Sequence, residues 1–504
     1  MDEPFKTGAV ESAQRTGAAA RAVEASSNTG DTTQHNTPEY PLPRKQADTE
    51  TDITKDTAIG SQDSSPKFPN ARQQLVTLQQ VISLACFGVT ILNGLLPLYS
   101  KTVGAEGLDV GFLWALRALM TALPRPIIGR GIDKYGRKVF LLGGIALIAV
   151  SMLCFAYARS FTFEIGGTVL FVGTLNFGRF MLYAGQIIQG LGLGTILLAS
   201  LTMTADLAKT AGRGTSFGYT EQAQYRGGLL GALVAVPIII IYGLGPEGIS
   251  ITPEAWTRMF LIFAAVAVAA LVLTWRRLQD TKIIAHSEPE AASPTSSKVN
   301  PQLYVLMAII ALTSASAYGL MPFILRYLED HITPRPELIA FAYIPAAIVW
   351  GTLPARMGRY SDRFGRKPVM VVGLIGSAIL SLFIPLIAVI VPPRESIQVL
   401  GYAVPIALIL LSLFVAAEAV TYSAATPAEQ ALASDMMGGK ARGQGFGLYT
   451  FARSAGEVIG PIAMGAVYEF RPSGAFIVNT IILIIGSLLV WFALKDPATS
   501  RRVP

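Results

Sequence analysis

Long apolar runs separated by short polar clusters dominate the sequence from about residue 74 onward. Each run is long enough to cross ~30 Å of hydrocarbon as a helix. Such runs are predicted at 74–98, 109–130, 139–158, 183–205, 217–242, 255–276, 302–325, 337–357, 368–391, 402–426, 445–468 and 474–494. Backbone groups in a bilayer must be hydrogen-bonded internally, which favours helices. The pattern predicts an all-α membrane protein with twelve transmembrane helices in two bundles of six.

The polar segments divide this chain into five regions. Residues 1–70 are polar and nearly free of aromatic side chains, which predicts a disordered cytoplasmic tail. We expect six-helix bundles at 71–277 and 301–495, a cytoplasmic linker at 278–300 and a short tail at 496–504. The stretch 161–182 is long for a connection, and we expect it to hold a short interfacial helix or to extend the neighbouring spans.

The charge distribution predicts the orientation of the chain. Charged residues make up only 14% of the sequence and the net charge is +7, whereas soluble domains average about 25% charged residues. With the N-terminus inside, the inner loops and C-terminal tail carry twenty Lys and Arg residues and the outer loops eight. The positive-inside rule then places both termini in the cytoplasm of a multi-pass protein of the cell membrane. The basic excess is interpreted as a topology signal, and no nucleic-acid surface is predicted.

A set of residues repeats at a constant separation of 229 positions. Gly129, Asp133, Gly136, Arg137 and Lys138 recur as Gly358, Asp362, Gly365, Arg366 and Lys367. Asp206 and Arg213 recur as Asp435 and Arg442 at the same separation. Both copies of the loop follow the second span of their half, so the halves are predicted to be parallel repeats about an axis along the membrane normal.

The loop Gly-x-x-x-Asp-x-x-Gly-Arg-Lys, present twice in a six-plus-six arrangement, resembles the major facilitator superfamily over residues 74–495. The resemblance implies a secondary transporter that works by alternating access. Arg125-Pro126 is similar to bacterial efflux-type members. Two departures do not favour proton-coupled antiport: Gln186 stands where many members have arginine, and the Gly-Pro pair lies in the eleventh span rather than the fifth.

The repeated loop residues predict a network at the cytoplasmic edge. Gly136 and Gly365 are expected where the backbone needs a positive φ, and Asp133 is expected to cap a helix N-terminus. The spacing suggests the network Arg137–Asp206–Arg213, repeated as Arg366–Asp435–Arg442. The resemblance implies that this network is a cytoplasmic latch, and the alternative is that the charges only set topology. As surface pairs, each would contribute ~0–1 kcal/mol.

Ionisable residues inside the spans are candidates for solute and proton binding, because their burial in lipid is costly. Glu418 has no cation within four residues of it and is the first choice for a proton carrier. Arg117 and Arg226 either bind an anionic solute or lock the bundle by pairing with Glu221 and Glu418. The further candidates are the i,i+4 pair Arg453 and Glu457, which either pair with each other or act on the solute, and the polar Asn93 and Gln186.

The remaining chemistry of the sequence argues against an enzyme. Its two cysteines lie in separate apolar runs, and neither a metal-ligand cluster, a nucleophile–base set nor a P-loop is evident. No cofactor or metal is predicted. We expect a monomer in the bilayer that exports drug-like or metabolite compounds coupled to protons. The alternatives are an uptake symporter for a sugar or organic anion, and a membrane sensor that retains the fold.

Overall fold

A computed structural model describes twelve stretches of the chain, and every structural statement below concerns these residues. They are 71–103, 107–159, 164–169, 173–208, 212–245, 248–249, 252–282, 301–332, 343–391, 395–399, 402–437 and 442–495. The predicted tails, 1–70 and 496–504, and residues 283–300 of the predicted linker lie outside the described residues.

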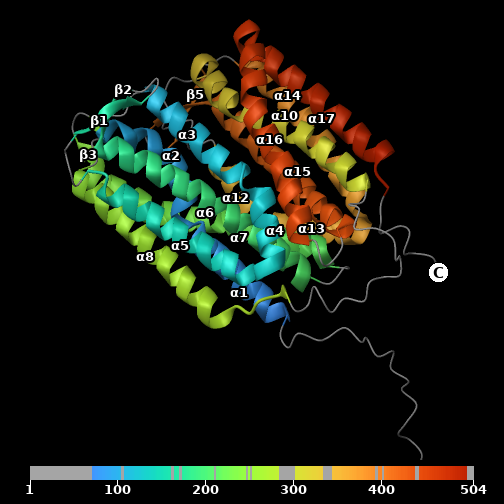
Figure 1. Cartoon of the computed structure of the whole chain (residues 1–504). Helices are drawn as coiled ribbons and strands as arrows, with labels where there is room; N and C mark the ends of the chain where they lie inside the picture. The colour runs from blue at the N-terminus through green and yellow to red at the C-terminus, as the bar shows by residue number, and fades with distance from the viewer. Residues whose placement is uncertain are drawn as a thin grey trace, which may run out of the picture. The chain divides into compact units, whose positions relative to one another are not determined.

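Helices form two groups that follow each other in the chain (Figure 1). The amino-terminal group holds α1 (Ala71–Ala85), α2 (Phe87–Thr102), α3 (Gly107–Ala122), α4 (Arg125–Tyr135), α5 (Arg137–Tyr157), α6 (Phe177–Leu207), α7 (Arg213–Gly243) and α8 (Pro253–Arg277). The carboxy-terminal group holds α10 (Pro301–His331), α12 (Ile344–Thr352), α13 (Pro354–Phe364), α14 (Arg366–Ile390), α15 (Ile406–Met436), α16 (Arg442–Phe470) and α17 (Pro472–Ala493). We call these groups the N-half and the C-half.

The described helices account for twelve spans. Seven of them, α5, α6, α8, α10, α14, α15 and α17, are each long and apolar enough to cross a membrane. Three further spans consist of two consecutive helices, α1 with α2, α3 with α4, and α12 with α13, and the 31-residue α7 and 29-residue α16 complete the set. The prediction of an all-α membrane fold is confirmed.

The 229-residue repeat is visible in the element boundaries. Helices α5, α6 and α7 begin at residues 137, 177 and 213, and α14, α15 and α16 begin at 366, 406 and 442. Helix α4 spans 125–135 and α13 spans 354–364, so they also match in length. The register is lost only after α7, because a connection at 244–252 precedes α8 whereas α17 follows α16 almost directly.

Short antiparallel hairpins replace the predicted structure at two connections. Within 161–182, strands β1 (Glu164–Val169) and β2 (Gly173–Asn176) form a hairpin, with Val169 opposite Gly173, instead of an interfacial helix. The other predicted alternative is confirmed in part, because α6 begins at Phe177 and so extends the span predicted from residue 183. Strands β5 (Ser396–Val399) and β6 (Tyr402–Pro405) form the equivalent hairpin of the C-half. The tenth span, predicted at 402–426, lies in α15, but its bounds differ, because α15 starts after β6 and continues to Met436. A third pair, β3 (Leu244–Gly245) and β4 (Gly248–Ile249), lies between α7 and α8.

Two of the broken spans have a proline at the break, although α7, α14, α15 and α16 each continue through an internal proline. Pro124 separates α3 from α4, and Pro354 begins α13 directly after α12. Proline has no backbone N–H and its ring clashes with the preceding turn, so an α-helix cannot run through it undisturbed. The carbonyl groups in the last turn of α12 then need donors from elsewhere.

Each half is packed around aromatic and aliphatic side chains, and its outer face is apolar. In the N-half, Tyr99 contacts Trp256 and Phe260 at ring-centroid distances of 5.0 and 4.8 Å. Apolar side chains also lie on the surface, for example Val389, which is 80% exposed, and Phe492, which is 79% exposed. Exposed apolar faces of this extent fit contact with lipid rather than water.

Glycine is required at the junctions of α4 with α5 and of α13 with α14, where Gly136 has φ 105° and Gly365 φ 100°. The predicted positive φ is thus confirmed at both positions. We expect Gly136→Ala to lower the free energy of unfolding by about 1–3 kcal/mol, because this backbone region is nearly exclusive to glycine and a Cβ would also meet the Asp280 carboxylate.

Gly143→Ala is the matched control, because a Cβ at Gly143 in α5 would meet no atom within 4 Å. Alanine there should be neutral or stabilising by about 0.5–1 kcal/mol. Thermal unfolding in detergent measures both, and equal midpoints for the two variants would contradict the assignment of strain to Gly136.

Candidate functional site

Two carboxylates at the ends of α4 and α13 cap helices that belong to the opposite half. Asp133 accepts hydrogen bonds from the backbone N–H groups of Gly443 (3.0 Å) and Gln444 (2.8 Å) in the first turn of α16. Asp362 accepts from the N–H groups of Gly214 and Thr215, both at 2.8 Å, in the first turn of α7. A helix N-terminus offers unpaired N–H groups and a favourable dipole for an anion, so each carboxylate ties the two halves together.

Two further carboxylates each bridge an arginine of their own half and an arginine of the other half. Asp206 lies 3.0 Å from Arg137 Nε and 3.0 Å from Arg442 Nη1. Asp435 forms an ion pair with Arg366 and lies 2.8 Å from Arg213 Nη1. The predicted trios were therefore wrong in their third member, because Arg213 and Arg442 exchange partners between the halves.

The prediction that these ion pairs lie at the surface was also wrong. Arg137 is fully buried, Arg442 is 2% exposed and Asp206 is 6% exposed. Removing one partner from a buried pair leaves an uncompensated charge and costs about 3–5 kcal/mol, far more than for a surface pair. We call the residues Asp133, Arg137, Asp206, Arg213, Asp362, Arg366, Asp435 and Arg442 the latch, and the end of the molecule where they lie the latch end.

Glycines allow the backbones of the two halves to approach at the latch. A Cβ at Gly443 would lie 2.6 Å from the carbonyl oxygen of Gly129, and a Cβ at Gly214 would lie 2.6 Å from that of Gly358. The helices α4 and α16 therefore meet backbone to backbone, as do α13 and α7. This close approach is the physical reason for the repeated glycines.

The predicted lysines of the repeated loop act within their own halves. Lys138 Nζ donates to the carbonyl oxygen of Trp275 at 2.9 Å, near the end of α8. Lys367 Nζ donates to that of Leu494 at 2.7 Å, just after α17. Both therefore satisfy carbonyls at a helix C-terminus and do not join the crossed pairs.

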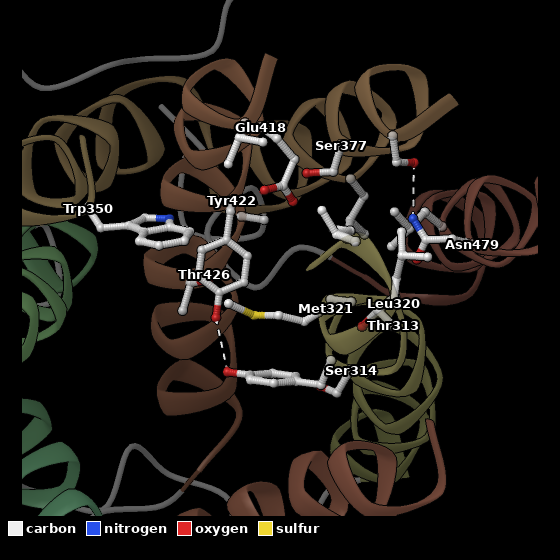
Figure 2. A pocket seen from close by; sticks show the side chains of 18 of the residues that line it. Thr313, Ser314, Leu320, Met321, Trp350, Ser377, Glu418, Tyr422, Thr426 and Asn479 are labelled. Carbon is white, nitrogen blue, oxygen red and sulfur yellow. Dashed lines mark hydrogen bonds between the residues drawn. The ribbon is translucent and has the colours of Figure 1, made fainter. Parts of the chain in front are cut away.

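A cavity of about 390 Å3 lies largely within the C-half (Figure 2). Helices α10, α14 and α15 supply most of its wall, including Ser377 and Glu418, and α7 of the N-half adds Tyr225. Aromatic side chains close one side, where Tyr225 stacks on Trp350 with centroids 5.4 Å apart. A mostly apolar cavity with a few polar groups is typical of small-molecule sites.

Glu418 is the acidic side chain predicted to carry protons, and it lines this cavity together with Ser377 and Tyr422 (Figure 2). In the described part of the chain no arginine, lysine or histidine forms an ion pair with it. A half-buried carboxylate without a counter-charge favours either a proton or a cationic group of a ligand.

Arg453 is placed on the cavity wall and is the centre of a polar cluster. Its Nη2 donates to the hydroxyls of Tyr422 (2.6 Å) and Tyr318 (2.9 Å). Its Nε lies 3.5 Å from Glu457, the i,i+4 pair that was one of the two predicted alternatives, and its Nη1 lies 3.8 Å from Glu429. Arg453 is thus bound to neighbours on three helices, α10, α15 and α16.

The other predicted candidates lie away from the described cavity wall. Arg117 lies over the ring of Trp114, 5.2 Å from its centroid, and Gln186 is buried in α6. Glu221 is buried and accepts from Gln430 Nε2 at 3.1 Å, across the two halves. Arg226 donates to a backbone carbonyl of α12 rather than to Glu221 or Glu418. The side chain of Asn93 is outside the described residues.

Sequence reasoning missed Glu429, which lines the cavity and accepts from Tyr449 Oη at 2.5 Å. The tenth span was predicted to end at residue 426, so Glu429 lay beyond it and was not considered. With the observed end of α15 at Met436, its spacing of eleven residues from Glu418 places both on one helix face. Tyr225, Trp350 and Asn479 also line the cavity, and their sequence context carries no comparable signal.

The chain matches known proteins over most of its length. Residues 81–411 and 306–504 match the family model described as Major Facilitator Superfamily. Quinolone resistance protein NorA of Staphylococcus aureus (strain MRSA252) is 25% identical, and the match covers 79% of this chain and 90% of that protein. Multidrug resistance protein MdtG of Serratia proteamaculans (strain 568) is also 25% identical, over 87% of this chain and 98% of that protein.

Solved structures of three transporters share the fold. A double Trp mutant of XylE superposes with a TM-score of 0.68 at 14% identity and covers 84% of this chain and 96% of its own. The human organic anion transporter MFSD10 (TETRAN) gives 0.61 at 14% identity, over 84% of this chain and all of its own. The fucose:proton symporter FucP of E. coli gives 0.63 at 13% identity, over 85% of this chain and all of its own. At these identities the likeness concerns the fold alone.

The exchange of arginines between the halves can be tested by double-mutant cycles on thermal stability. Arg213→Ala and Asp435→Ala should show a coupling energy of about 1–3 kcal/mol, because each removes the partner of the other. Arg213→Ala with Asp206→Ala is the control cycle and should be additive within about 0.5 kcal/mol. Coupling in the control cycle with additivity in the first would contradict the crossed arrangement.

Proposed function

The chain belongs to the major facilitator superfamily, and from this premise we propose that it exports small organic compounds from the cell by alternating access, in exchange for protons. The observation that carries the proposal is a single arrangement: residues of both halves close the latch end, while a cavity of about 390 Å3 lies between that end and the hairpins β1–β2 and β5–β6. Opening one end while the other closes would expose this cavity to each side in turn.

Export is favoured over uptake by the names of the curated relatives, which are a quinolone resistance protein and a multidrug resistance protein. The lining of the cavity fits such compounds, because Trp350, Tyr225 and Tyr422 offer aromatic faces and Glu418 offers one acidic group. A cavity of this size and character suits a compact organic molecule.

Glu418 is the residue that we propose to carry the proton. It lies on α15, the same helix that ends at the latch residue Asp435, and it lines the cavity without a counter-charge in the described structure. Release of the proton would leave a carboxylate in an apolar wall, which a cationic solute or a new proton would then neutralise.

We further propose the membrane arrangement predicted from the charges. The latch end faces the cytoplasm, both termini lie inside, and the protein works as a monomer in the cell membrane. The segment after α8 supports a link between linker and latch, since Thr281 Oγ1 donates to Asp206 at 2.9 Å. Asp280 accepts from the backbone N–H groups of Arg137 and Lys138 at 3.2 and 3.3 Å.

The direct test of this function is flux in proteoliposomes with and without an imposed pH gradient, using a panel that includes a quinolone, a sugar and an organic anion. We expect the quinolone to accumulate against its gradient when protons can flow in the opposite direction. Accumulation of the sugar or the anion together with protons would instead support uptake, and the absence of flux for every compound would contradict the transporter proposal.

Glu418→Gln should abolish accumulation driven by the pH gradient, because the amide cannot release a proton. Downhill flux of an uncharged compound should change less than about threefold, since the cavity keeps its shape. Gln224→Leu, on α7 away from the cavity wall, serves as the control. Gradient-driven accumulation by Glu418→Gln at the wild-type level would exclude Glu418 as the proton carrier.

Asp133→Asn and Arg137→Ala should lower the transport rate by at least about tenfold while leaving membrane insertion intact. Each removes a charge from the latch and so shifts the equilibrium between the open and closed states of the latch end. Arg137→Ala also takes the own-half partner from the buried Asp206, at a cost of about 3–5 kcal/mol. Expression and size-exclusion profiles report insertion and folding. Full transport by either variant would mean that the latch charges only set topology.

A further inference from the structure

We propose that a second gate lies between the latch and the cavity, in which the side chains of Gln222 and Arg226 on α7 hold the backbone carbonyl of Gly351 at the end of α12. This inference rests on the proposed alternation between two states, and it assigns Gln222 and Arg226 to the control of that alternation rather than to solute binding. We call these three residues the carbonyl gate.

The contacts of the carbonyl gate join the two halves at one atom. Gln222 Nε2 lies 2.8 Å from the Gly351 oxygen and Arg226 Nε lies 3.0 Å from it. Gln222 is 3% exposed, so water does not replace its hydrogen bond, whereas Arg226 is an exposed residue. One buried acceptor therefore receives two donors from the opposite half.

The acceptor is available because the span is broken between α12 and α13. Helix α12 ends at Thr352, so Gly351 lies in its last turn, where carbonyl groups have no donor within the helix. A buried carbonyl without a donor is costly. Side chains of α7 thus supply hydrogen bonds to the Gly351 carbonyl at the break between α12 and α13. The carbonyl would lose both hydrogen bonds when the halves separate.

The carbonyl gate is distinct from the latch in position. Gln222 follows Gly214, the residue capped by Asp362, by eight positions in the same helix, which corresponds to ~12 Å at 1.5 Å per residue. On its other side the gate adjoins the cavity, because Tyr225 precedes Arg226 and Trp350 precedes Gly351. These two aromatic residues stack on each other and line the cavity. A molecule that displaces this stack would therefore act on the residues next to Arg226 and Gly351 in the chain.

The equivalent helix pair in the other half of the repeat is joined by different residues. Arg125 at the start of α4 donates from Nη1 to the carbonyl oxygen of Thr450 (2.7 Å) and to Ser454 Oγ (2.6 Å) on α16. The position equivalent to Gln222 in the C-half is Phe451, and that equivalent to Arg226 is Ala455. The latch is therefore repeated, whereas contacts deeper in the membrane are specific to each helix pair and are not a consequence of the repeat.

The test measures the separation of the halves at the latch end by pulsed electron–electron double resonance, which gives the distance between two spin labels. Tyr135→Cys and Phe364→Cys carry the labels, because these residues are 62% and 61% exposed and occupy equivalent positions at the ends of α4 and α13. Cys86→Ala and Cys154→Ala remove the native thiols. We expect the double variant Gln222→Leu/Arg226→Gln to raise the ratio of long to short distances at least about fivefold over the labelled parent.

Two variants control for misfolding and for local effects. Gln222→Glu keeps the size of the side chain but replaces the donating amide by an acceptor, so it should shift the distances in the same direction. Gln224→Leu changes a glutamine in the same turn of α7 that forms no hydrogen bond with Gly351 in the described structure, and it should leave the distances as in the parent. Asp133→Asn provides the reference for an opened latch.

An unchanged distance distribution in both Gln222→Glu and the double variant, with a shift in Asp133→Asn, would overturn the carbonyl gate. The same holds if Gln224→Leu shifts the distances as much as Gln222→Glu. Because the labels report conformation without any solute, this result is independent of whether the flux assay supports export. Failure of flux with a clear shift in distances would refute the proposed function and leave the carbonyl gate standing.

Discussion

Two buried carboxylates, Asp206 and Asp435, hold the two halves of the molecule together at one end. Each is shared by an arginine of its own half and an arginine of the other half. A charge buried in this way is stable only while its partners stay in place. The surrounding structure serves that requirement: glycines let the helices approach, and the carboxylates of Asp133 and Asp362 cap the helices that deliver the arginines.

The exchange of arginines between halves explains what sequence could and could not reveal. The apolar runs predicted the twelve spans, and the repeated spacing predicted the parallel halves and the positive φ of Gly136 and Gly365. It could not distinguish a pair of Asp206 with Arg213 from one with Arg442, because in a parallel repeat both arginines occupy the same position of the motif. The burial of these ion pairs was missed for the same reason, since each pair would be exposed in its own half and is buried only by contact with the other half. The hairpins and Glu429 were missed because strand and helix boundaries between apolar segments depend on packing.

The residues that depart from the repeat divide into two groups with different surroundings. Glu418 and Arg453 lie on the cavity wall, where one carboxylate is unpaired in the described structure and one guanidinium is held by Tyr318 and Tyr422. Arg226 and Gln222, which the sequence did not single out, donate hydrogen bonds to a backbone carbonyl between the cavity and the latch. Symmetric contacts therefore close the end of the molecule, and asymmetric contacts adjoin the cavity, where a solute without symmetry would bind.

The central claim is that the latch end closes as the opposite end opens. The most direct test records two distances in parallel samples: between labels at Tyr135 and Phe364 at the latch end, and between labels at Phe180 in α6 and Leu413 in α15 near the hairpins. These positions are exposed. In Asp206→Asn the account predicts a longer distance at the latch end together with a shorter one near the hairpins. Lengthening at both ends, or a change at the latch end alone, would mean that loss of the charge only loosens the protein, and would contradict alternating access controlled by this network.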